Sequence, residues 1–288
     1  MKSKTITTFI ILSNFLLNCH PEKVQDKIGF QYISGVIVVN AKLNNSIEGL
    51  FQLDTGANNS FIRKKYANEL GISTAGTIKG IGPGGASFES PKAEKLSFSI
   101  NNHSQLLTDC SIIDMTNQKV PDNFIGLIGS DYLKEFIITI DFKDKTLVFE
   151  DIHSLKYRLS SGIKTSLNFT HDAPNIPYVH VTFNDSIFSN YIFDTGVPIT
   201  TLSYNDFTIL GLHNEVKSLE KKSKNILGNN FETYSTTIST FGLDNLLKLS
   251  NIKIESCENC SGLIGNNFIS KFIITLNYKE SYLICKTI

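Results

Sequence analysis

The sequence predicts an all-β protein of two lobes that arose by internal duplication. The tripeptide Asp-Thr-Gly stands at residues 54–56 and again at 194–196, each time after a run of strand-forming apolar residues. A block that begins Gly-Leu-Ile-Gly and continues into Phe-Ile-Ile-Thr also occurs once in each half, from Gly126 and from Gly262. Two copies with a period near 140 residues indicate a duplicated domain rather than a solenoid.

The N-terminus has the pattern of an export signal. Two lysines precede an apolar stretch from Ile6 to Leu17, which is too short to stay in a bilayer as a spanning helix. Leu-Leu-Asn-Cys at residues 16–19 resembles a bacterial lipobox, whose cysteine is lipidated; a plain secretory signal cleaved nearby is the alternative. We expect residues 1–19 to be a lipoprotein-type signal peptide and residues 20–29, which are polar and aperiodic, to be a tether.

Composition and charge narrow the possible partners. The chain has 288 residues, of which 41% are hydrophobic and 19% charged, and this suits two globular domains with their own cores. Its 27 basic and 27 acidic residues cancel and no basic stripe is visible, so nucleic acid is not an expected partner. We expect an exported protein that a lipid on Cys19 holds to a membrane, on the periplasmic or cell-surface side.

The N-terminal half begins with a predicted hairpin that leads into the first Asp-Thr-Gly. Residues 36–43 and 47–53 have strand composition, and Asn-Asn-Ser between them is a turn sequence. Residues 64–70, after the motif, suit one or two helical turns that end before Gly71. The C-terminal half repeats this plan over residues 178–211, and subtracting 54 from 194, or 71 from 211, gives 140 each time.

The two Asp-Thr-Gly turns together indicate acid–base chemistry. Glycine permits a tight turn and threonine can hydrogen-bond locally, so each carboxylate would be held rigidly. If the turns face each other, Asp54 and Asp194 cannot both ionise, and the pair keeps one proton. One carboxyl can then act as base and the other as acid, and together they can activate a water molecule. The alternative is that each motif is only an Asx-type turn at a strand end.

A glycine-rich segment lies between the two blocks of the N-terminal half. Residues 79–85, Lys-Gly-Ile-Gly-Pro-Gly-Gly, are flanked by β-like runs, which favours a mobile hairpin tip. The segment lacks the Gly-Lys-Ser/Thr ending and the following helix of a phosphate loop. The alternative is a flexible surface loop. The C-terminal half offers only Leu-Gly-Asn-Asn at residues 227–230, so we expect one such hairpin, in the first lobe.

In combination, these motifs resemble the retropepsin and pepsin families of aspartic peptidases over nearly all of residues 30–288. Asp-Thr-Gly followed by Ala57 is similar to the retropepsin motif, the Gly-Leu-Ile-Gly blocks resemble bacterial retropepsin-like proteins, and two lobes in one chain resemble pepsin. The resemblance implies an all-β, two-lobed acid-protease (pepsin/retropepsin-like) fold formed by internal duplication. It implies an N-terminal retropepsin-like lobe at residues 30–158 and a C-terminal one at residues 159–288.

The resemblance also implies a site built from both lobes, with Asp54 and Asp194 as the catalytic pair. The active-site loops around them are Thr55, Gly56, Ala57, Thr195, Gly196 and Val197. The glycine-rich hairpin becomes a flap that binds substrate through Gly80, Ile81, Gly82, Gly84 and Gly85. The strands that support the Asp loops contain Ile128, Gly129, Ile264 and Gly265. For these last residues the alternative is a buried strand with a glycine bend.

The implied function is that of an aspartic endopeptidase, which hydrolyses peptide bonds through a water activated by an Asp dyad, one Asp from each lobe. We expect the polypeptide substrate to lie extended in the cleft, with strand-like hydrogen bonds, and we expect no metal and no organic cofactor. The chain would work as a monomer, because each lobe finds its partner in the same chain. The alternative is a non-catalytic peptide-binding or surface-interaction lipoprotein that retains the fold.

Two positions depart from the patterns of these families. Val197 stands where they usually have Ser, Thr or Ala, and its branched side chain could crowd the dyad. Asp131 in the first block becomes Asn267 in the second, from which we expect only a changed surface contact. Because neither Ala57 nor Val197 can donate a hydrogen bond from its side chain, we expect the dyad to titrate high and activity to peak in mildly acidic to near-neutral conditions.

Four cysteines remain besides Cys19, namely Cys110, Cys257, Cys260 and Cys285. In an exported protein they could pair, and the sequence leaves their pairing open. Cys257 and Cys260 have the spacing of a redox or zinc hairpin, but no second such pair and no nearby histidine accompany them. We therefore expect a structural disulfide or inert thiols at these positions.

Overall fold

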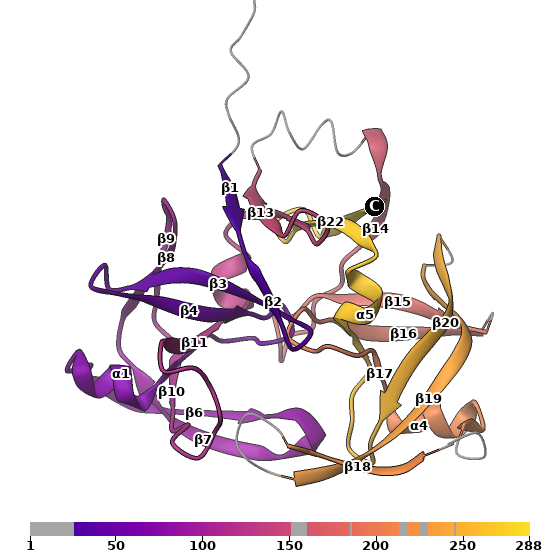
Figure 1. Ribbon diagram of the computed structural model, residues 1–288, viewed down its shortest axis with the longest axis horizontal. Helices are drawn as coiled ribbons and strands as arrows, with labels where there is room; N and C mark the ends of the chain where they lie inside the picture. The colour runs from indigo at the N-terminus through magenta and orange to yellow at the C-terminus, as the bar shows by residue number, and fades with distance from the viewer. Residues whose placement is uncertain (1–25, 151–159, 185, 213–217, 225–229, 245) are drawn as a thin grey trace, which may run out of the picture.

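The computed structural model describes residues 26–150, 160–184, 186–212, 218–224, 230–244 and 246–288. Strands dominate these residues, and the helices among them are short (Figure 1). Cys19 and the expected signal peptide lie outside the described residues. Within the described ranges, no helix is long and apolar enough to span a membrane.

A ten-stranded sheet makes up most of the N-terminal half. Its strands are β2 Gln31–Ile33, β3 Val36–Leu43, β4 Ile47–Leu53, β5 Phe61–Arg63, β6 Thr74–Ile81, β7 Ser87–Ala93, β8 Leu96–Ile100, β9 His103–Leu107, β10 Cys110–Ile113 and β11 Phe124–Ile128. They follow the spatial order β6-β7-β10-β5-β11-β4-β3-β8-β9, with β2 beside β3. The β3–β4 hairpin pairs Leu43 with Ile47 across the predicted turn, and β11 lies parallel to β4.

A seven-stranded sheet makes up most of the C-terminal half. Its strands are β15 Tyr178–Phe183, β16 Ser186–Phe193, β17 Thr201–Leu202, β18 Ser218–Lys224, β19 Asn230–Leu243, β20 Leu247–Ser256 and β21 Leu263–Ile264. They follow the order β15-β16-β21-β17-β20-β19-β18. The β15–β16 hairpin repeats β3–β4, and β21 lies parallel to β16 as β11 lies parallel to β4. The duplication in the sequence is therefore a duplication of topology.

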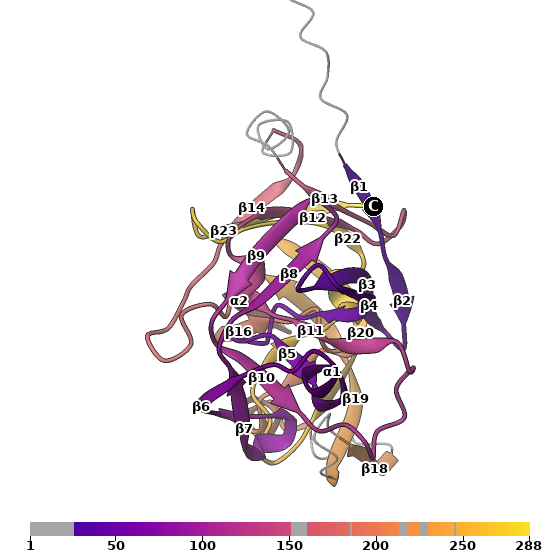
Figure 2. The same ribbon diagram turned by 90° about the vertical axis from the view of Figure 1, so that its left-hand side faces the viewer.

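A six-stranded sheet joins the two halves. Its strands are β1 Lys27–Gly29, β12 Ile137–Asp141, β13 Thr146–Phe149, β14 Ile163–Ser166, β22 Phe272–Asn277 and β23 Tyr282–Thr287, in the order β1-β13-β12-β22-β23-β14. At its centre β12 and β22 pair antiparallel, and the buried hydroxyls of Thr139 and Thr275 lie 2.7 Å apart. Figure 2 shows this sheet at one end of the molecule, above the other two. The halves are thus held together by backbone hydrogen bonds.

Two segments of this sheet differ from the sequence-based expectation. Residues 27–29 were expected in an aperiodic tether, but they form β1 and pair with β13. Residues 163–166, for which the sequence analysis predicted no strand, form β14 and pair with β23. Both strands are short and lie at the sheet edges, so their order comes from pairing and not from a local hydrophobic pattern.

Among the described residues, four short α-helices occur in two equivalent pairs, one pair after the Asp loops and one directly after the Gly-Leu-Ile-Gly tetrapeptides. The first pair, α1 Lys64–Glu69 and α4 Tyr204–Ile209, confirms the predicted helical turns. A glycine with positive φ stands two residues after each helix, Gly71 at 59° and Gly211 at 67°, a conformation that glycine adopts without steric cost. The second pair, α2 Ser130–Leu133 and α5 Asn266–Ile269, follows β11 and β21 directly.

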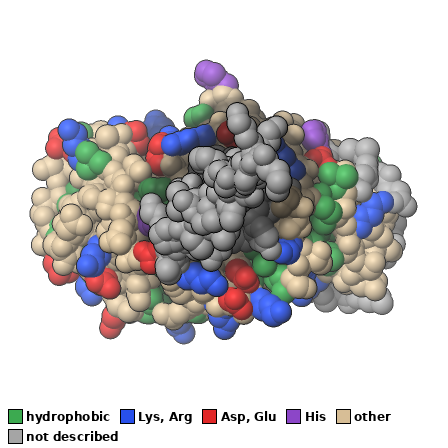
Figure 3. Space-filling view, turned by 90° about the horizontal axis from the view of Figure 1, so that it is seen from above, with side chains coloured by type: hydrophobic (Ala, Val, Ile, Leu, Met, Phe, Trp, Pro, Cys, Tyr) green, Lys and Arg blue, Asp and Glu red, His purple; other side chains and the backbone are tan. Residues whose placement is uncertain are grey.

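One hydrophobic cluster runs through both halves and forms the core. Within it, Phe51 and Phe98 pack edge to face at 5.6 Å, and Phe241 and Phe268 do so at 4.7 Å. Each such ring contributes about 1.5–3 kcal/mol by leaving water. On the face that Figure 3 shows, positive and negative side chains are interspersed wherever described residues are visible.

Candidate active site

The two Asp loops leave equivalent strands and are held by equivalent partners. Asp54 follows Leu53 at the end of β4, and its N–H donates to the carbonyl of Ile128 in β11, at 3.0 Å. Asp194 follows the end of β16, and its N–H donates to the carbonyl of Ile264 in β21, also at 3.0 Å. The strands that contain Ile128 and Ile264, which were expected to support the Asp loops, therefore lie directly beside the two aspartates.

The two threonines next to the aspartates bind the loops to each other. The N–H of Thr55 donates to Oγ1 of Thr195 at 3.1 Å, and the N–H of Thr195 donates to Oγ1 of Thr55 at 3.0 Å. Each hydroxyl then donates across the boundary, Thr55 to the carbonyl of Phe193 and Thr195 to that of Leu53. Both threonines are completely buried. Four reciprocal hydrogen bonds in a dry environment hold the loops in one arrangement.

The glycines of the two loops bring the carboxyl groups together. A Cβ placed on Gly56 would overlap the carboxyl of Asp194, and one placed on Gly196 would overlap the carboxyl of Asp54. Only glycine leaves room for each carboxyl to lie against the opposite loop. The two carboxyl groups are hydrogen-bonded to each other.

Backbone N–H groups of each loop also face its own carboxylate. Gly56 donates to Oδ1 of Asp54 at 2.9 Å, and Gly196 donates to Oδ1 of Asp194 at 2.7 Å. The backbones of Ala57 and Val197 provide a further hydrogen bond to the respective carboxyl. Val197 is partly exposed and occupies the place of Ala57 in the second loop. The side chains of Ala57 and Val197 are aliphatic, so neither can donate a hydrogen bond to the dyad.

The electrostatics of the pair favour a single shared proton. Burial raises the pKa of Asp54 to about 6, and the hydrogen bonds from Asp194, Gly56 and Ala57 hold it from going higher. Burial and then the charge of Asp54 raise the pKa of Asp194 well above its usual range. Asp194 is only 6% exposed, whereas Asp54 is partly exposed. The two carboxyls therefore cannot both ionise, and the pair holds one proton and one negative charge and titrates as a unit.

The difference between Asp131 and Asn267 is not a surface contact, so that expectation was wrong. In the first half, the N–H and hydroxyl of Ser60 donate to the Asp131 carboxylate at 3.0 and 2.6 Å. In the second half, the N–H and hydroxyl of Thr200 donate to Oδ1 of Asn267 at 2.8 and 2.9 Å. Burial raises the pKa of Asp131, although these donors favour its ionised form. Each side chain thus fixes the outer end of an Asp loop.

The glycines after the supporting strands lie against the same loops. A Cβ on Gly129 would lie 2.8 Å from the carbonyl oxygen of Ala57, and one on Gly265 would lie 2.5 Å from the carbonyl carbon of Ile199. The N–H of Gly129 donates to the hydroxyl of Ser60 at 3.0 Å. These contacts explain why the block reads Ile-Gly at this point in both halves.

The glycine-rich segment forms the tip of the β6–β7 hairpin. Gly80 faces the ring of Phe88 across the hairpin, and Ile81 beside it is 78% exposed. The tip is a 3-10 turn at Pro83–Gly85, closed by hydrogen bonds from the Gly82 N–H to the Ala86 carbonyl and from the Gly85 N–H to the Gly82 carbonyl. Gly84 and Gly85 both have φ of 75°, which a residue with a side chain rarely adopts.

The hairpin tip rests on the C-terminal half. A Cβ on Gly85 would lie 2.6 Å from Cβ of Asn259, so the backbone of Gly85 packs closely against the side chain of Asn259. Figure 1 shows the hairpin reaching under the space between the two halves towards the C-terminal sheet. The residues that were expected to form a flap therefore contact the second half through Asn259. Asp54, Asp194, their loops and the strands beside them form one hydrogen-bonded network.

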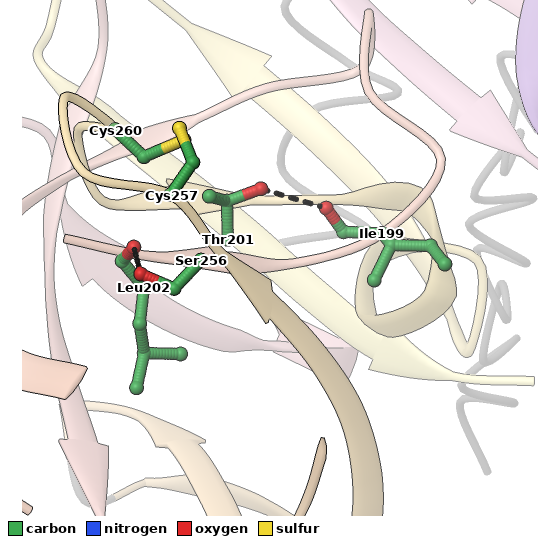
Figure 4. Close-up of a disulfide and its surroundings, with 6 residues drawn as sticks. All are labelled: Ile199, Thr201, Leu202, Ser256, Cys257 and Cys260. Carbon is green, nitrogen blue, oxygen red and sulfur yellow. Dashed lines mark hydrogen bonds between the residues drawn. A yellow bond between two sulfur atoms is a disulfide. The ribbon is translucent and has the colours of Figure 1, made fainter. Parts of the chain in front are cut away.

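A disulfide closes the turn that carries Asn259. Cys257 and Cys260 are bonded, with Cα atoms 5.0 Å apart, whereas Cys110 and Cys285 are buried free thiols. The turn follows β20, whose Ser256 hydroxyl donates to the carbonyl of Leu202 at 3.1 Å (Figure 4). Leu202 lies in β17, the strand after the second Asp loop. The Ser256 hydrogen bond therefore joins the start of the disulfide turn to the segment that follows the loop of Asp194.

Apolar side chains surround the first Asp loop. A small cluster, separate from the main core, has Val38, Phe61 and Leu127 among its buried members. The partly buried residues packed against it are Val36, Ala57, Phe88 and Val120. They come from β3, the Asp loop, the flap hairpin and the segment before β11, so an apolar surface extends from the flap to the dyad.

Several residues of this site were not identified from the sequence. Ser130 and Asn266, the first residues of α2 and α5, donate to the carbonyls of Thr55 and Thr195, each at 2.8 Å. Their signal was available, because they occupy the same position in the two Gly-Leu-Ile-Gly blocks. Asn259 had no such signal, because its role depends on the three-dimensional position of the hairpin tip.

Comparisons with known proteins agree with this geometry. Residues 39–132 match the model of an aspartyl protease family, over a stretch that includes the first Asp loop and the first Gly-Leu-Ile-Gly block. No curated protein sequence matches the chain. The family match supports the aspartic-protease resemblance for this part of the chain.

Among solved structures, basic 7S globulin from soybean superposes with a TM-score of 0.56 at 11% identity, over 91% of this chain and 94% of that chain. Conglutin gamma, a basic 7S globulin from lupine seeds, gives a TM-score of 0.53 at 12% identity, over 90% and 93% of the two chains. At these identities the likeness concerns the fold alone. The predicted all-β, two-lobed acid-protease fold is confirmed.

Proposed function

We propose that the protein is an aspartic endopeptidase. The observation that carries the proposal is the contact between the carboxyls of Asp54 and Asp194, which come from the two halves and are hydrogen-bonded to each other. The reciprocal bonds between Thr55 and Thr195 support it, because they hold both loops before any ligand binds. Such preorganisation is what acid–base catalysis by two carboxyls requires.

The proposed reaction uses each carboxyl in a different role. The Asp54 carboxylate accepts a proton from a water molecule as the water oxygen bonds to the peptide carbonyl carbon. Asp194 gives its proton to the carbonyl oxygen, which yields a tetrahedral diol. Transfer of the proton now on Asp54 to the amide nitrogen lets the carbon–nitrogen bond break, and one diol hydroxyl returns a proton to Asp194. The products are a carboxylic acid and an amine.

The proposed substrate is a polypeptide in extended conformation. The flap hairpin and the loops around the dyad provide backbone groups that can pair with an extended strand. The partly buried apolar side chains Val36, Phe88 and Val120 favour an apolar substrate residue next to the dyad. No metal or organic cofactor enters the proposed reaction.

We further propose that the mature chain acts as a monomer on the outer side of a membrane, anchored through Cys19. If Cys19 is acylated, the wild-type protein should partition into detergent and Cys19→Ala should release it or stall its processing. Recovery of the wild type in the soluble exported fraction would contradict the anchor. This outcome would leave the peptidase proposal untouched.

Peptide cleavage by the purified chain tests the proposal. A protein that lacks residues 1–19 is incubated with a mixed peptide library, with and without a statine-type inhibitor, beside Asp54→Asn and Asp194→Asn. We expect inhibitor-sensitive cleavage by the wild type and a loss of roughly two to four orders of magnitude in each variant, with the fold kept. Binding of extended peptides without cleavage at any pH would favour a peptide-binding lipoprotein that keeps the fold.

A further inference from the structure

Two hydroxyl groups lie in series behind the first Asp loop. Oγ of Ser130 donates to the carbonyl oxygen of Thr55 at 2.8 Å. The hydroxyl of Tyr278 lies 3.0 Å from the same Ser130 oxygen. All three side chains are buried, with Tyr278 only 7% exposed.

The direction of the second hydrogen bond follows from the first. A serine hydroxyl has one hydrogen, and a carbonyl oxygen can only accept, so the Ser130 hydrogen belongs to the bond with Thr55. Tyr278 must therefore donate to Ser130. Tyr278 follows β22 in the C-terminal half, whereas Ser130 and Thr55 belong to the N-terminal half. The chain of donors thus crosses from one half to the Asp loop of the other.

The second Asp loop is held by a similar pair of hydrogen bonds, but the outer partner is of a different kind. The amide of Asn266 donates to the carbonyl of Thr195 and to the carbonyl of Gly35, both at 2.8 Å. Here too the outer partner, Gly35, comes from the opposite half. That partner is a backbone carbonyl, whereas the outer partner of Ser130 is the side chain of Tyr278.

The position that matches Tyr278 in the first half is held by phenylalanine. Subtracting 136, the offset of the Gly-Leu-Ile-Gly blocks, from 278 gives 142, and Phe142 packs edge to face on Phe30 at 5.8 Å. A ring without a hydroxyl therefore satisfies the packing at this point of the fold. The hydroxyl of Tyr278 serves the contact with Ser130.

We propose that Tyr278 is a positioning residue for Asp54, which acts through Ser130 and Thr55. The hydrogen bonds from Tyr278 to Ser130 and from Ser130 to Thr55 hold the Thr55 carbonyl in place. They thereby hold the peptide groups of Gly56 and Ala57, whose N–H groups donate to the Asp54 carboxylate. The role of Tyr278 in turnover rests on the proposed peptidase function. Its effect on the titration of the Asp54 carboxylate is independent of that function, because it depends only on the geometry of the loop.

The electrostatics keep Tyr278 in the donating form. Burial raises its pKa above the ordinary range; the bond with Ser130 lowers it in part, and the charge of Asp54 adds to the rise. Two further carboxyl groups lie at the same loops: Asp194, which is paired with Asp54, and Asp131, which accepts from Ser60. Lys134 lies near Asp131 and favours its charged form.

The test compares Tyr278→Phe with Tyr282→Phe. Tyr282 is a buried tyrosine at the start of β23, which pairs with β22 in the six-stranded sheet, and its hydroxyl accepts from the amide of Asn277 at 3.1 Å, away from the Asp loops. Carboxyl carbon NMR with labelled aspartate follows the titration of the dyad in each protein, with Asp54→Asn as the assignment reference. This readout needs no turnover, so a chain that cleaves nothing still tests the proposal.

In Tyr278→Phe, a looser Thr55 peptide weakens the N–H bonds that favour ionised Asp54, so the dyad should titrate at higher pH. Tyr282→Phe should titrate as the wild type does. If the chain is a peptidase, the acidic limb of its rate profile should move with the titration, and kcat should fall about tenfold with little change in KM. An unshifted titration in a folded Tyr278→Phe would overturn the proposal.

Ser130→Ala provides a second test, which also serves if Tyr278→Phe folds poorly. If Tyr278 acts through Ser130, adding Tyr278→Phe to Ser130→Ala should cause no further shift of the dyad titration. Independent, additive shifts in the double variant would overturn the proposed route. So would a Ser130→Ala protein that titrates as the wild type does.

Discussion

Thr55 and Thr195 exchange hydrogen bonds between backbone and hydroxyl across the two halves, at 3.1 and 3.0 Å. Each threonine completes the loop of the other, so neither half can form its Asp loop fully without its partner. The arrangement explains how a chain of two weakly similar halves builds one site. It also predicts that loss of one hydroxyl is felt in both loops.

Thr195→Val should destabilise the protein by about 2–4 kcal/mol, because it leaves the buried N–H of Thr55 without an acceptor. Chemical denaturation measures this loss. Thr182→Val is the matched control: Thr182 is also buried, and its hydroxyl has no partner among the described residues. That variant should stay within about 0.5 kcal/mol of the wild type or gain stability. Equal losses in the two variants would contradict the role given to Thr195.

Gly196→Ala should lower kcat/KM for peptide cleavage by about two orders of magnitude or more, because the new methyl group overlaps the Asp54 carboxyl and displaces it. Gly29→Ala is a suitable control, since nothing lies within 4 Å of a Cβ at that position. The measurement is kcat/KM on one cleaved peptide. Full activity in Gly196→Ala would show that the carboxyls do not need their close contact.

The stability of the protein should depend on pH through Asp54. Its folded-state pKa of about 6 lies above the unfolded value, so its contribution is fully present below the unfolded pKa, near pH 4, and is lost as pH rises through 6. Asp54→Asn removes this loss. The unfolding free energy of the variant minus that of the wild type should therefore be about 2 kcal/mol more favourable at pH 8 than at pH 4. Glu69→Gln, at an exposed side chain at the end of α1, should show no such difference. Parallel pH curves for wild type and Asp54→Asn would contradict the burial of this charge.

The disulfide of Cys257 and Cys260 should control how the flap closes. It fixes the turn of Asn259, on which Gly85 rests, so reduction should raise KM about threefold or more and leave kcat within about twofold. A dithiol reductant supplies the test, and Cys257→Ser with Cys260→Ser supplies the control, because this double variant should no longer respond. A similar response in both proteins would place the effect elsewhere.

Much of the fold was predictable from the sequence because the duplication made local patterns readable twice. The hairpins before Asp54 and Asp194, and the helices that end at Gly71 and Gly211, follow from turn residues and strand composition at a constant offset. The strand at residues 27–29 was missed because three residues carry no periodicity, and pairing with β13 orders them.

The site was predictable to the same extent. Repeated motifs pointed to the two aspartates and their loops, and chemistry pointed to a shared proton. The contact of Tyr278 with Ser130 and that of Gly85 with Asn259 were beyond reach, because each joins residues far apart in sequence without a motif. Asp131 was misjudged as a surface residue because a carboxylate is usually exposed, and its burial depends on the Ser60 donors.

The pH dependence of kcat/KM, measured for the wild type and for Ala57→Ser, tests the dyad most directly. Because the proposed reaction needs one carboxyl ionised and the other protonated, the profile should be bell-shaped, with an acidic limb near pH 6 and an optimum in mildly acidic to near-neutral conditions. A serine at position 57 adds a donor to the Asp54 carboxylate and should move the acidic limb to lower pH. A wild-type optimum below about pH 4, or an unmoved limb in Ala57→Ser, would contradict a desolvated dyad that shares one proton.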